Sequence, residues 1–438
     1  MNYYSLNKKA LNVSFKDAVI SGLAPDKGLY FPEKITPLSK YFFDQIESFS
    51  NEEIAFEVIK QFVGNEIQQT ALKQIIKETL CFDFPVVEID KNISTLELFH
   101  GPTMAFKDVG ARFMARCFGY FNKDKNATKV TVLVATSGDT GGAVASGFLG
   151  IKDVDVVILY PSGKVSDVQE KQLTTLGRNI KALEVNGTFD DCQAMVKTAF
   201  LDPELIGYRN LTSANSINVA RWLPQMFYFF FAYKLLKAKK KDLVFSVPSG
   251  NFGNICAGAM AQKLGLPIKQ LIASTNINAI VPNYLATGVY IPKPSKQTIS
   301  NAMDVGDPSN FIRIKEIYKN DDTLLKKNIS SFSFTDDETR NAMKEIKSIS
   351  GYIADPHGAV GYLGLKKYFD NNNNNNNNNN TQSVFLETAH PVKFLDVVEP
   401  VLNETIEYPQ QIVNVIDKKK VSIKISSYEG LKNYLLTN

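Results

Sequence analysis

The stretch STLELFHGPTMAFKDVGARF, residues 94–113, decides the fold class. Its first part, STLELF (94–99), is an apolar run typical of a β-strand, and the residues from Asp108 onward have the pattern of a helix. A turn with Gly101 and Pro102 separates the two and ends in a single lysine, Lys107. Because most lysines are exposed surface charges, Lys107 alone indicates no function, and its meaning depends on the rest of the chain.

Three further segments repeat this order of strand, polar loop and helix. They are VLVATSGDTGGAVASGFL (132–149), VFSVPSGNFGNICAGAMAQKL (244–264) and SVFLETAHPVKFLDVV (383–398). Apolar strands that alternate with helices predict parallel sheets covered on both faces. Ligands of such α/β sheets bind beyond the carboxyl ends of the strands. We therefore expect the four loops to converge on one ligand.

The length of 438 residues allows more than one core. We predict a mostly helical N-terminal region over 1–90, an α/β domain with the lysine over 91–236, and a second α/β domain over 237–438. Ten consecutive asparagines at 371–380 bury too little apolar surface to become ordered, which predicts a surface-loop insertion in the second domain.

Composition excludes several classes of protein. A net charge of +4 argues against a nucleic-acid partner. The apolar stretch at 222–236 is too short to span a membrane, and no secretory signal is visible, so we expect a buried helix there and a cytoplasmic protein. The cysteines and histidines lack metal-ligand spacing, so we expect no metal and reduced, buried thiols; they are Cys81, Cys117, Cys192, Cys256, His100, His357 and His390.

Two of the loops have the composition of anion-binding loops. SGNFGN (249–254) suits a phosphate, because its glycines allow close approach and the next helix begins there. TSGDTGG (136–142) suits a carboxylate held by successive backbone amides. An ordinary glycine-rich turn and an ordinary helix N-cap explain the two loops equally well locally. No dinucleotide fingerprint and no P-loop motif occur in the chain.

A lysine, a phosphate loop and a carboxylate loop together suit pyridoxal phosphate. A lysine amine forms a Schiff base with the aldehyde of this cofactor. The apolar neighbours Met104 and Phe106 would desolvate the amine of Lys107 and lower its pKa. The hydroxyl of Thr388 is placed to meet the pyridine nitrogen.

The motifs resemble those of threonine synthases of the longer bacterial and fungal branch. The similar blocks include VSFKDAVISGLAPDKGLYFPE (13–33), LFHGPTMAFKD (98–108), ATSGDTGGAVA (135–145), NSINVARWLPQ (215–225), PSGNFGN (248–254), SNAMDVGDPSNF (300–311), ADPHGAVG (354–361) and ETAHPVKF (387–394). Small departures are Lys27, Asp307, Gly358 and the asparagine tract.

The resemblance implies the tryptophan-synthase-β-like fold, fold type II among pyridoxal-phosphate enzymes. It implies a lyase that converts O-phospho-L-homoserine and water to L-threonine and phosphate by γ-elimination and β-addition of water. Lys107 is then the catalytic Schiff-base lysine. The expected cofactor contacts are Phe106, Lys107, Asp139, Gly250, Asn251, Phe252, Gly253, Asn254 and Thr388, and the expected substrate contacts are Thr103, Ser137, Gly138, Thr140, Asn215, Ser216 and Arg221.

Three points stay open in the sequence. Arg221 suits the substrate phosphate because guanidinium binds phosphate in a bidentate manner, but a surface arginine in an ion pair is nearly as good an explanation, and Lys164 is a second candidate. Another fold-type-II lyase, such as a serine/threonine dehydratase, is the alternative function. The oligomeric state cannot be predicted.

Overall fold

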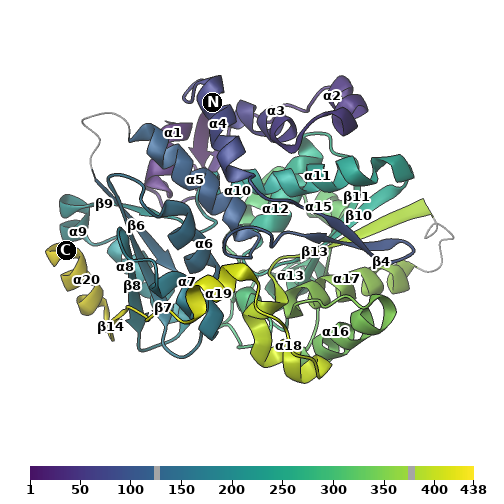
Figure 1. Ribbon diagram of the computed structural model, residues 1–438. Coiled ribbons are helices and arrows are strands. Elements are labelled where there is room, and N and C mark those ends of the chain that lie inside the picture. The colour runs from purple at the N-terminus through teal and green to yellow at the C-terminus, as the bar shows by residue number, and fades with distance from the viewer. Residues whose placement is uncertain (123–128, 373–379) are drawn as a thin grey trace.

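The molecule is built on three β-sheets, which Figure 1 shows in a computed structural model describing residues 1–122, 129–372 and 380–438. The smallest sheet lies in the N-terminal region and pairs its strands antiparallel in the order β2-β1-β3. Four α-helices accompany it before residue 80. These elements are β1 (Asn2–Ser5), β2 (Val13–Ser14), α1 (Phe15–Ser21), β3 (Tyr30–Pro32), α2 (Lys40–Gln45), η1 (Ile46–Ser48), α3 (Asn51–Val63) and α4 (Gln69–Thr79).

The second sheet has five parallel strands in the order β14-β8-β7-β6-β9. Every residue of the interior strand β6 is buried, as expected for a parallel sheet covered on both faces. Its elements are α5 (Lys107–Phe121), β6 (Val130–Ala135), α6 (Asp139–Phe148), β7 (Val154–Pro161), α7 (Asp167–Thr174), β8 (Ile180–Val185), α8 (Phe189–Ala199), α9 (Pro203–Tyr208), β9 (Asn210–Ser213), β14 (Ile423–Ile425) and α20 (Tyr428–Thr437).

The third sheet has six strands in the order β12-β11-β10-β13-β5-β4. All its pairs are parallel except that of the edge strand β4 with β5. Its elements are β4 (Val86–Asp90), β5 (Ile93–Glu97), β10 (Asp242–Pro248), α12 (Gly253–Lys263), β11 (Ile268–Thr275), α13 (Ile280–Thr287), η4 (Asn301–Met303), α14 (Phe311–Ile317), α15 (Asp322–Asn328), β12 (Ile329–Ser333), α16 (Asp336–Ser350), α17 (Pro356–Asn372), β13 (Thr381–Glu387), η6 (Pro391–Phe394), α18 (Leu395–Leu402) and α19 (Gln410–Ile416).

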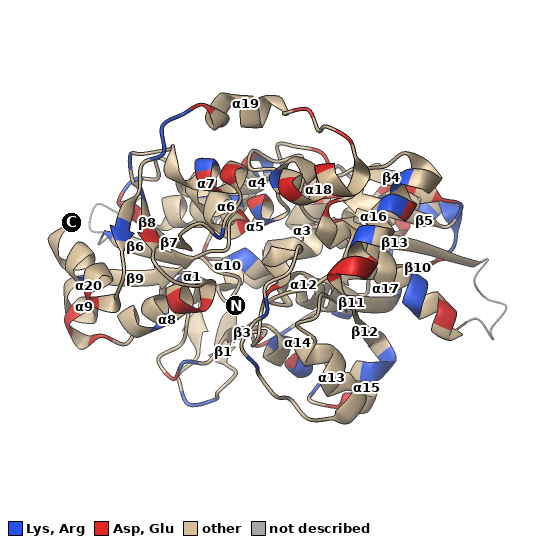
Figure 2. Cartoon of the chain, turned by 90° about the horizontal axis from the view of Figure 1, so that it is seen from below, with Lys and Arg blue, Asp and Glu red and all other residues tan. Residues whose placement is uncertain are grey.

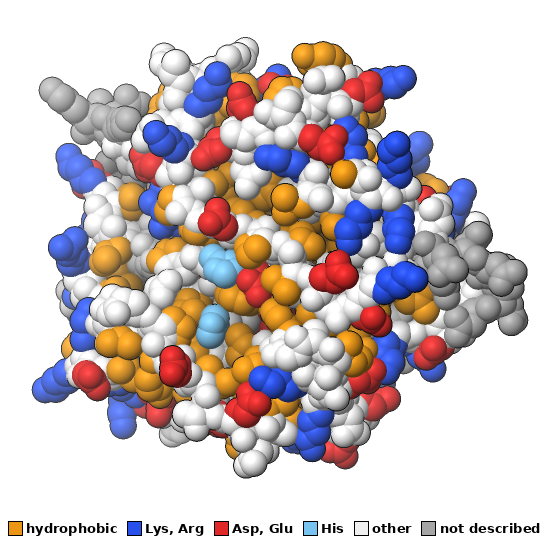
Figure 3. All heavy atoms as spheres, turned by 45° about the vertical axis from the view of Figure 1, so that its right-hand side comes forward, with side chains coloured by type: hydrophobic (Ala, Val, Ile, Leu, Met, Phe, Trp, Pro, Cys, Tyr) orange, Lys and Arg blue, Asp and Glu red, His pale blue; other side chains and the backbone are white. Residues whose placement is uncertain are grey.

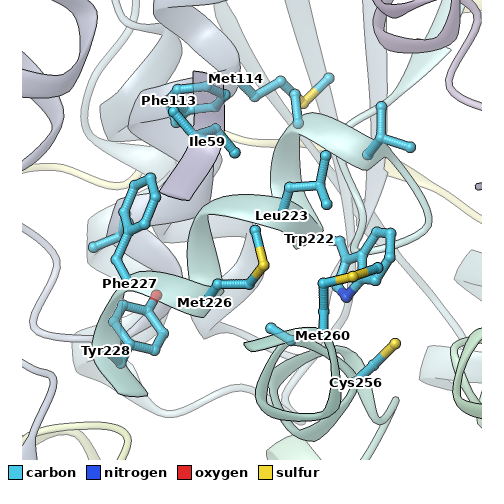
Figure 4. Packing of buried hydrophobic residues seen from close by; sticks show 14 of the residues in the cluster. Ile59, Phe113, Met114, Trp222, Leu223, Met226, Phe227, Tyr228, Cys256 and Met260 are labelled. Atoms are coloured by element: carbon cyan, nitrogen blue, oxygen red, sulfur yellow. The ribbon is translucent and has the colours of Figure 1, made fainter. Parts of the chain in front are cut away.

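The apolar stretch at 222–236 forms a buried helical rod, as predicted. It comprises α10 (Val219–Trp222), η2 (Leu223–Met226), α11 (Phe227–Leu236) and η3 (Lys237–Lys239). Figure 4 shows its side chains between those of α5 and α12, with Trp222 and Met226 at the centre. Trp222 is completely buried. The rod therefore joins the helices that start at two of the four loops.

Each of the two larger sheets contains strands from both sides of the predicted domain boundary at residue 236. Strand β5 pairs with β13 of the third sheet, and the C-terminal segment returns to the second sheet, where β14 pairs with β8. Figure 1 shows this yellow segment running from one half of the molecule to the other. The predicted domain boundaries remain a prediction.

The structure also bears on two smaller expectations, the burial of the cysteines and the loop formed by the asparagine tract. Cys117, Cys192 and Cys256 are buried, but Cys81 is exposed, because it follows the end of α4 at the surface, where Arg112 Nη2 donates to its sulfur. Of the asparagine tract, residues 373–379 lie outside the described residues.

Figure 2 shows acidic and basic residues interspersed along the chain. None of the described helices is long and apolar enough to cross a membrane.

Candidate active site

The loop that carries Lys107 is fixed to the loop after β13. The backbone N–H of Phe106 donates to the Thr388 carbonyl at 2.8 Å, and Ala105 and Ala389 form a β-bridge. Met104 has a φ of 57°, a left-handed conformation that costs about 1–2 kcal/mol in a residue with a side chain. The contacts to the neighbouring loop hold this turn, and α5 then begins at Lys107 itself.

The amine of Lys107 has no hydrogen bond or ion pair within the described part of the chain. Its Nζ lies 5.7 Å from the centre of the Phe106 ring. Burial lowers the pKa of the amine from 10.5 to about 8; Asp139 opposes this shift, and Lys393 and Arg221 add to it. The neutral, nucleophilic form of Lys107 is therefore easily reached near neutral pH.

Asp139 starts α6, directly after the loop that follows β6. The preceding residue, Gly138, has a φ of 133°, and a Cβ there would collide with Gln169. Asp139 is almost fully buried and pairs with Lys393, whose Nζ lies 2.6 Å from Oδ1. Gln169 Nε2 donates to the same oxygen at 2.9 Å. Burial raises the pKa of this carboxyl, but Lys393 and Lys107 together bring it well below its usual range, so Asp139 is ionised.

The glycine-rich loop at 249–254 lies across the cavity from Lys107. Phe252, with a φ of 60°, precedes α12, which begins at Gly253. The first amides of a helix have no acceptor within it; that of Ile255 donates to Asn254 Oδ1 at 2.9 Å, whereas those of Gly253 and Asn254 have no partner among the described residues. Asn251 is held from outside the loop: its Nδ2 donates to Ser216 Oγ at 2.8 Å, and its Oδ1 accepts from Ser309 N at 2.7 Å. These contacts hold the loop at the start of α12, where the positive end of the helix suits a phosphate.

The four loops enclose one cavity of about 890 Å³, counting the space open to solvent. Most of the expected site residues line it; they are Phe106, Lys107, Ser137, Thr140, Asn215, Ser216, Arg221, Gly250, Asn251, Phe252, Gly253, Asn254 and Thr388. Arg221 is buried, and its Nη1 donates to the Ala214 carbonyl. Burial lowers the pKa of its guanidinium to about 10. The structure thus places Arg221 in the cavity wall and not on an exposed helix surface.

Three expected residues lie behind the wall. Thr103 donates through Oγ1 to Asp108 Oδ1 at 2.6 Å, so its hydroxyl is occupied within its own loop. Gly138 donates its N–H to Thr136 Oγ1 at 2.9 Å. Asp139 faces Lys393 and Gln169. None of these three is among the residues that line the cavity.

The cavity wall also contains polar residues that the sequence did not single out. Arg221 Nε, Gln225 Oε1 and Asn301 Oδ1 are buried without a hydrogen-bond partner among the described residues, and all three residues line the cavity. Gln225 and Asn301 lie within the blocks NSINVARWLPQ and SNAMDVGDPSNF. These blocks identified the two segments as similar to the family, but they did not indicate that these two side chains line the site. Such unpartnered atoms are typical of a site that binds a polar ligand.

The histidines have different places. His357 is buried at the cavity, where its Nδ1 lies 2.8 Å from Asp355 Oδ1 and its Nε2 accepts the N–H of Ala302 at 3.2 Å. His100 and His390 both pack against Phe99. Figure 3 shows two histidine side chains in an apolar hollow of the surface. No group of metal-ligating side chains is found in the described residues.

Pyridoxal phosphate fits these residues. The unpaired amine of Lys107, the amides at the start of α12 and the hydroxyl of Thr388, which has no partner within the described ranges, all border the same cavity. At Gly250 a Cβ would lie 2.7 Å from Met303 Cα and 2.8 Å from the Ala302 carbonyl, so only glycine lets the loop close around a ligand here.

Known families match the chain along most of its length. The pyridoxal-phosphate dependent enzyme family matches residues 88–384, the threonine synthase N terminus matches residues 2–80, and the C-terminal threonine synthase family matches residues 359–434. Threonine synthases from Buchnera aphidicola (subsp. Baizongia pistaciae) and Escherichia coli are 44% and 42% identical to it, each over 100% of both chains.

Solved structures give the same result. Threonine synthase from Escherichia coli has a TM-score of 0.92 at 40% identity, covering 100% of this chain and 99% of that chain. A pyridoxal-phosphate-bound threonine synthase from Brucella melitensis has a TM-score of 0.90 at 34% identity, with 100% and 99% covered. A threonine deaminase from Solanum lycopersicum, 16% identical with a TM-score of 0.56 over 85% of this chain and 96% of that one, shares the fold alone.

Proposed function

Because the chain belongs to the threonine synthase family of pyridoxal-phosphate dependent enzymes, we infer that it converts O-phospho-L-homoserine and water to L-threonine and phosphate. The observation that carries this function to particular residues is the partly buried, unpaired amine of Lys107, which faces the Gly250–Asn254 loop and Thr388 across one cavity. The fold is the predicted type II fold of these enzymes.

Each part of the cofactor has a matching group in the chain. We propose that Lys107 Nζ holds the aldehyde carbon, that the backbone amides of Gly250–Asn254 hold the phosphate, and that Thr388 Oγ1 contacts the pyridine nitrogen. Pyridoxal phosphate, when bound, supplies an electron sink for negative charge that develops on the substrate carbons. A hydroxyl partner leaves the pyridine nitrogen without the full positive charge that a carboxylate partner would favour.

Lys107 Nζ also moves the protons of the reaction. The substrate loses a proton from Cα and one from Cβ, and phosphate leaves from Cγ. A proton is then added at Cγ, the hydroxyl of water is added at Cβ, and a proton returns to Cα. Because burial lowers the pKa of this amine to about 8, both its neutral and its protonated form are accessible near neutral pH, which suits general acid–base catalysis. The amine can reach adjacent carbons in turn, so one residue serves several of these transfers.

The substrate phosphate needs a second anion site. We propose Arg221 for it, supported by Asn215 and by Ser137 and Thr140 of the β6 loop, because these residues line the same cavity. The unpaired Nε of Arg221 is a donor that has no partner in the described residues. Ser216 has a supporting place, since its hydroxyl accepts from Asn251 and Asn310. Lys164, the second candidate, is exposed and does not line the cavity.

The test is product formation by the purified protein with pyridoxal phosphate. We expect L-threonine and inorganic phosphate to appear in equal amounts from O-phospho-L-homoserine. Equal amounts exclude simple phosphatase activity, which would release phosphate without threonine. Release of ammonia from L-threonine or L-serine, without synthesis of threonine, would instead support the dehydratase alternative and overturn the proposal. The cytoplasmic location and the absence of a nucleic-acid partner remain predictions.

A further inference from the structure

Lys393 is a fully buried lysine that lies directly behind the active-site cavity. It belongs to η6, five residues after Thr388, and its side chain is 0% exposed. Its Nζ forms an ion pair with Asp139 Oδ1 at 2.6 Å and donates to the Thr103 carbonyl at 2.8 Å. A buried ammonium is costly unless it is paired and hydrogen-bonded, and these two contacts satisfy it.

The ammonium of Lys393 joins loops that come from different sheets. Asp139 starts the helix after β6 of the five-stranded sheet, whereas Thr103 lies in the loop after β5 of the six-stranded sheet. Two amides of α7 use the same acceptors: Gln169 Nε2 donates to Asp139 at 2.9 Å and Gln172 Nε2 donates to the Thr103 carbonyl at 3.1 Å. The network therefore fixes the loop of Lys107 relative to the loop of Asp139.

Three charged groups on three elements lie near enough to Lys107 to act on the charge of its amine. They are the carboxylate of Asp139 on α6, the ammonium of Lys393 on η6 and the guanidinium of Arg221 on α10. Asp139 is the single anion among them. Without a competing cation, Asp139 would be the natural ion-pair partner of Lys107, and that pair would hold Lys107 as an unreactive ammonium.

We propose that Lys393 is a positioning residue that binds the carboxylate of Asp139 and thereby prevents this carboxylate from capturing the amine of Lys107. The inference rests on the proposed role of Lys107, but the protonation state of Lys107 can be measured without cofactor or substrate. The effects of the neighbouring charges on the pKa of Lys107 predict how each substitution should shift it. Burial lowers the pKa of Lys107, Asp139 raises it, and Lys393 and then Arg221 lower it by smaller amounts.

The experiment is competitive labelling of the full-length chain with acetic anhydride over a range of pH, with mass spectrometry of the Lys107 peptide. The variants are K393M, D139N and the double variant K393M/D139N. The pH midpoint of labelling at Lys107 should fall in the order K393M, wild type, double variant, D139N. For K393M the upward shift should be about one pH unit or more, because an uncompensated carboxylate nearby shifts a pKa by about 1–3 units.

The controls separate positioning from general damage. K366M removes a lysine whose ion pair with Glu345 is at the surface, and its Lys107 midpoint should equal that of the wild type. K393R retains the positive charge and should keep the midpoint near the wild-type value. If K393M does not fold, the comparison of the double variant with D139N decides the matter, because the two differ only at Lys393; the midpoint of the double variant should lie above that of D139N.

Two results would overturn the proposal. One is a folded K393M with an unchanged or lower midpoint, and the other is a double variant whose midpoint is no higher than that of D139N. Because the labelling uses no pyridoxal phosphate, these results are distinguishable from a failure of the proposed reaction. A protein that makes no threonine but shows the predicted order of midpoints would refute the function and leave the charge arrangement in place.

Discussion

Arg221 combines burial with an incompletely used set of donors. Its Nη1 is bound to the Ala214 carbonyl, its Nε has no partner among the described residues, and its side chain borders the cavity. A guanidinium in this state can bind a doubly charged phosphate without losing an existing ion pair. Its main function is therefore expected to be with the substrate and not with the cofactor.

We expect Arg221→Lys to retain the bound cofactor and to lower kcat/KM for O-phospho-L-homoserine by roughly ten- to a hundred-fold. Lysine keeps the charge but loses the bidentate geometry, and a charge-assisted hydrogen bond contributes about 1.5–3 kcal/mol. Steady-state kinetics and the visible absorbance of the cofactor measure the two effects separately. Lys164→Ala is the matched control and should have normal kinetics; unchanged kinetics in Arg221→Lys with reduced turnover in Lys164→Ala would move the phosphate site to Lys164.

Glu387 is a second buried charged residue with an unusual state. It ends β13, is fully buried, accepts the N–H of Asp355 at 2.5 Å through Oε1, and has no partner for Oε2 in the described ranges. Burial raises the pKa of this carboxyl well above 4.5, and the neighbouring carboxylate of Asp355 raises it further. Glu387 is therefore protonated in the folded protein over a range of pH in which the unfolded chain has already lost the proton.

The pH dependence follows from that difference. The folded chain binds a proton that the unfolded chain releases above about pH 4.5, so stability falls as pH rises through this window. We expect Glu387→Gln, which is neutral at every pH, to gain melting temperature relative to the wild type as pH rises from about 5 to about 8. Glu33→Gln, at an exposed position, is the control for the loss of a surface carboxylate. A gap for Glu387→Gln that shrinks as pH rises would contradict the protonated state.

At the scale of single residues, the sequence predicted groups that act through local motifs and missed those that act through distant partners. Lys107, Gly250 and Thr388 were found because each lies in a loop directly after a strand. Lys393 was not found, because its role depends on an ion pair with Asp139, which lies far away in the chain. From the sequence alone, a lysine next to apolar residues looks like an exposed residue of a surface helix. Asp139 itself was expected to contact the cofactor, but its Oδ1 is bound by Lys393 and Gln169.

At the scale of elements, the packing of α17 on the six-stranded sheet depends on a glycine. Gly358 lies in the first turn of α17, and a Cβ built there would collide with the carboxyl of Glu387 on β13. The close approach of helix and strand is possible because Gly358 has no side chain. The glycine at position 358, a departure from the usual motif, thus makes room for the carboxyl of Glu387 on the neighbouring strand.

We expect Gly358→Ala to lower the free energy of unfolding by about 1–3 kcal/mol, which is the usual cost of overpacking in a core. The cost should largely disappear in the double variant Gly358→Ala/Glu387→Ala, which removes the colliding carboxyl. Gly207→Ala is the control, because Gly207 lies in the exposed part of α9 with nothing within 4 Å of a Cβ; it should be neutral or stabilising by up to about 1 kcal/mol. Chemical denaturation measures all three, and equal stability of Gly358→Ala and the wild type would contradict this account.

The strands and helices themselves were predicted from the sequence, but the pairing of the strands within the sheets was not. The four strand–loop–helix units occur as β5–α5, β6–α6, β10–α12 and β13–η6, because continuous apolar runs and glycine-rich turns are local signals. That β5 pairs with β13, or β14 with β8, depends on contacts between segments remote in sequence. Periodicity contains no information on such pairing, so the domain boundaries could not be derived from it.

At the scale of the whole molecule, the active site lies where the two parallel sheets meet. Loops at the carboxyl ends of β5, β10 and β13 from one sheet and of β6 from the other border the same cavity. The rod of α10, η2 and α11 packs between α5 and α12 behind it (Figure 4), and the C-terminal segment ties one half to the other (Figure 1). Ligands of open α/β sheets bind at such positions, so the fold places Lys107 where a ligand of this cavity would bind.

Reduction of the holoenzyme with borohydride tests whether Lys107 is the residue that binds pyridoxal phosphate covalently. The reduction makes the link between cofactor and amine permanent, and peptide mapping by mass spectrometry then identifies the lysine. We predict that the cofactor mass is found on the peptide that contains Lys107, and that Lys107→Ala, although folded, has no labelled peptide and forms threonine only at background level. A label on any other lysine of the wild type, or threonine synthesis by Lys107→Ala at a substantial rate, would contradict the account.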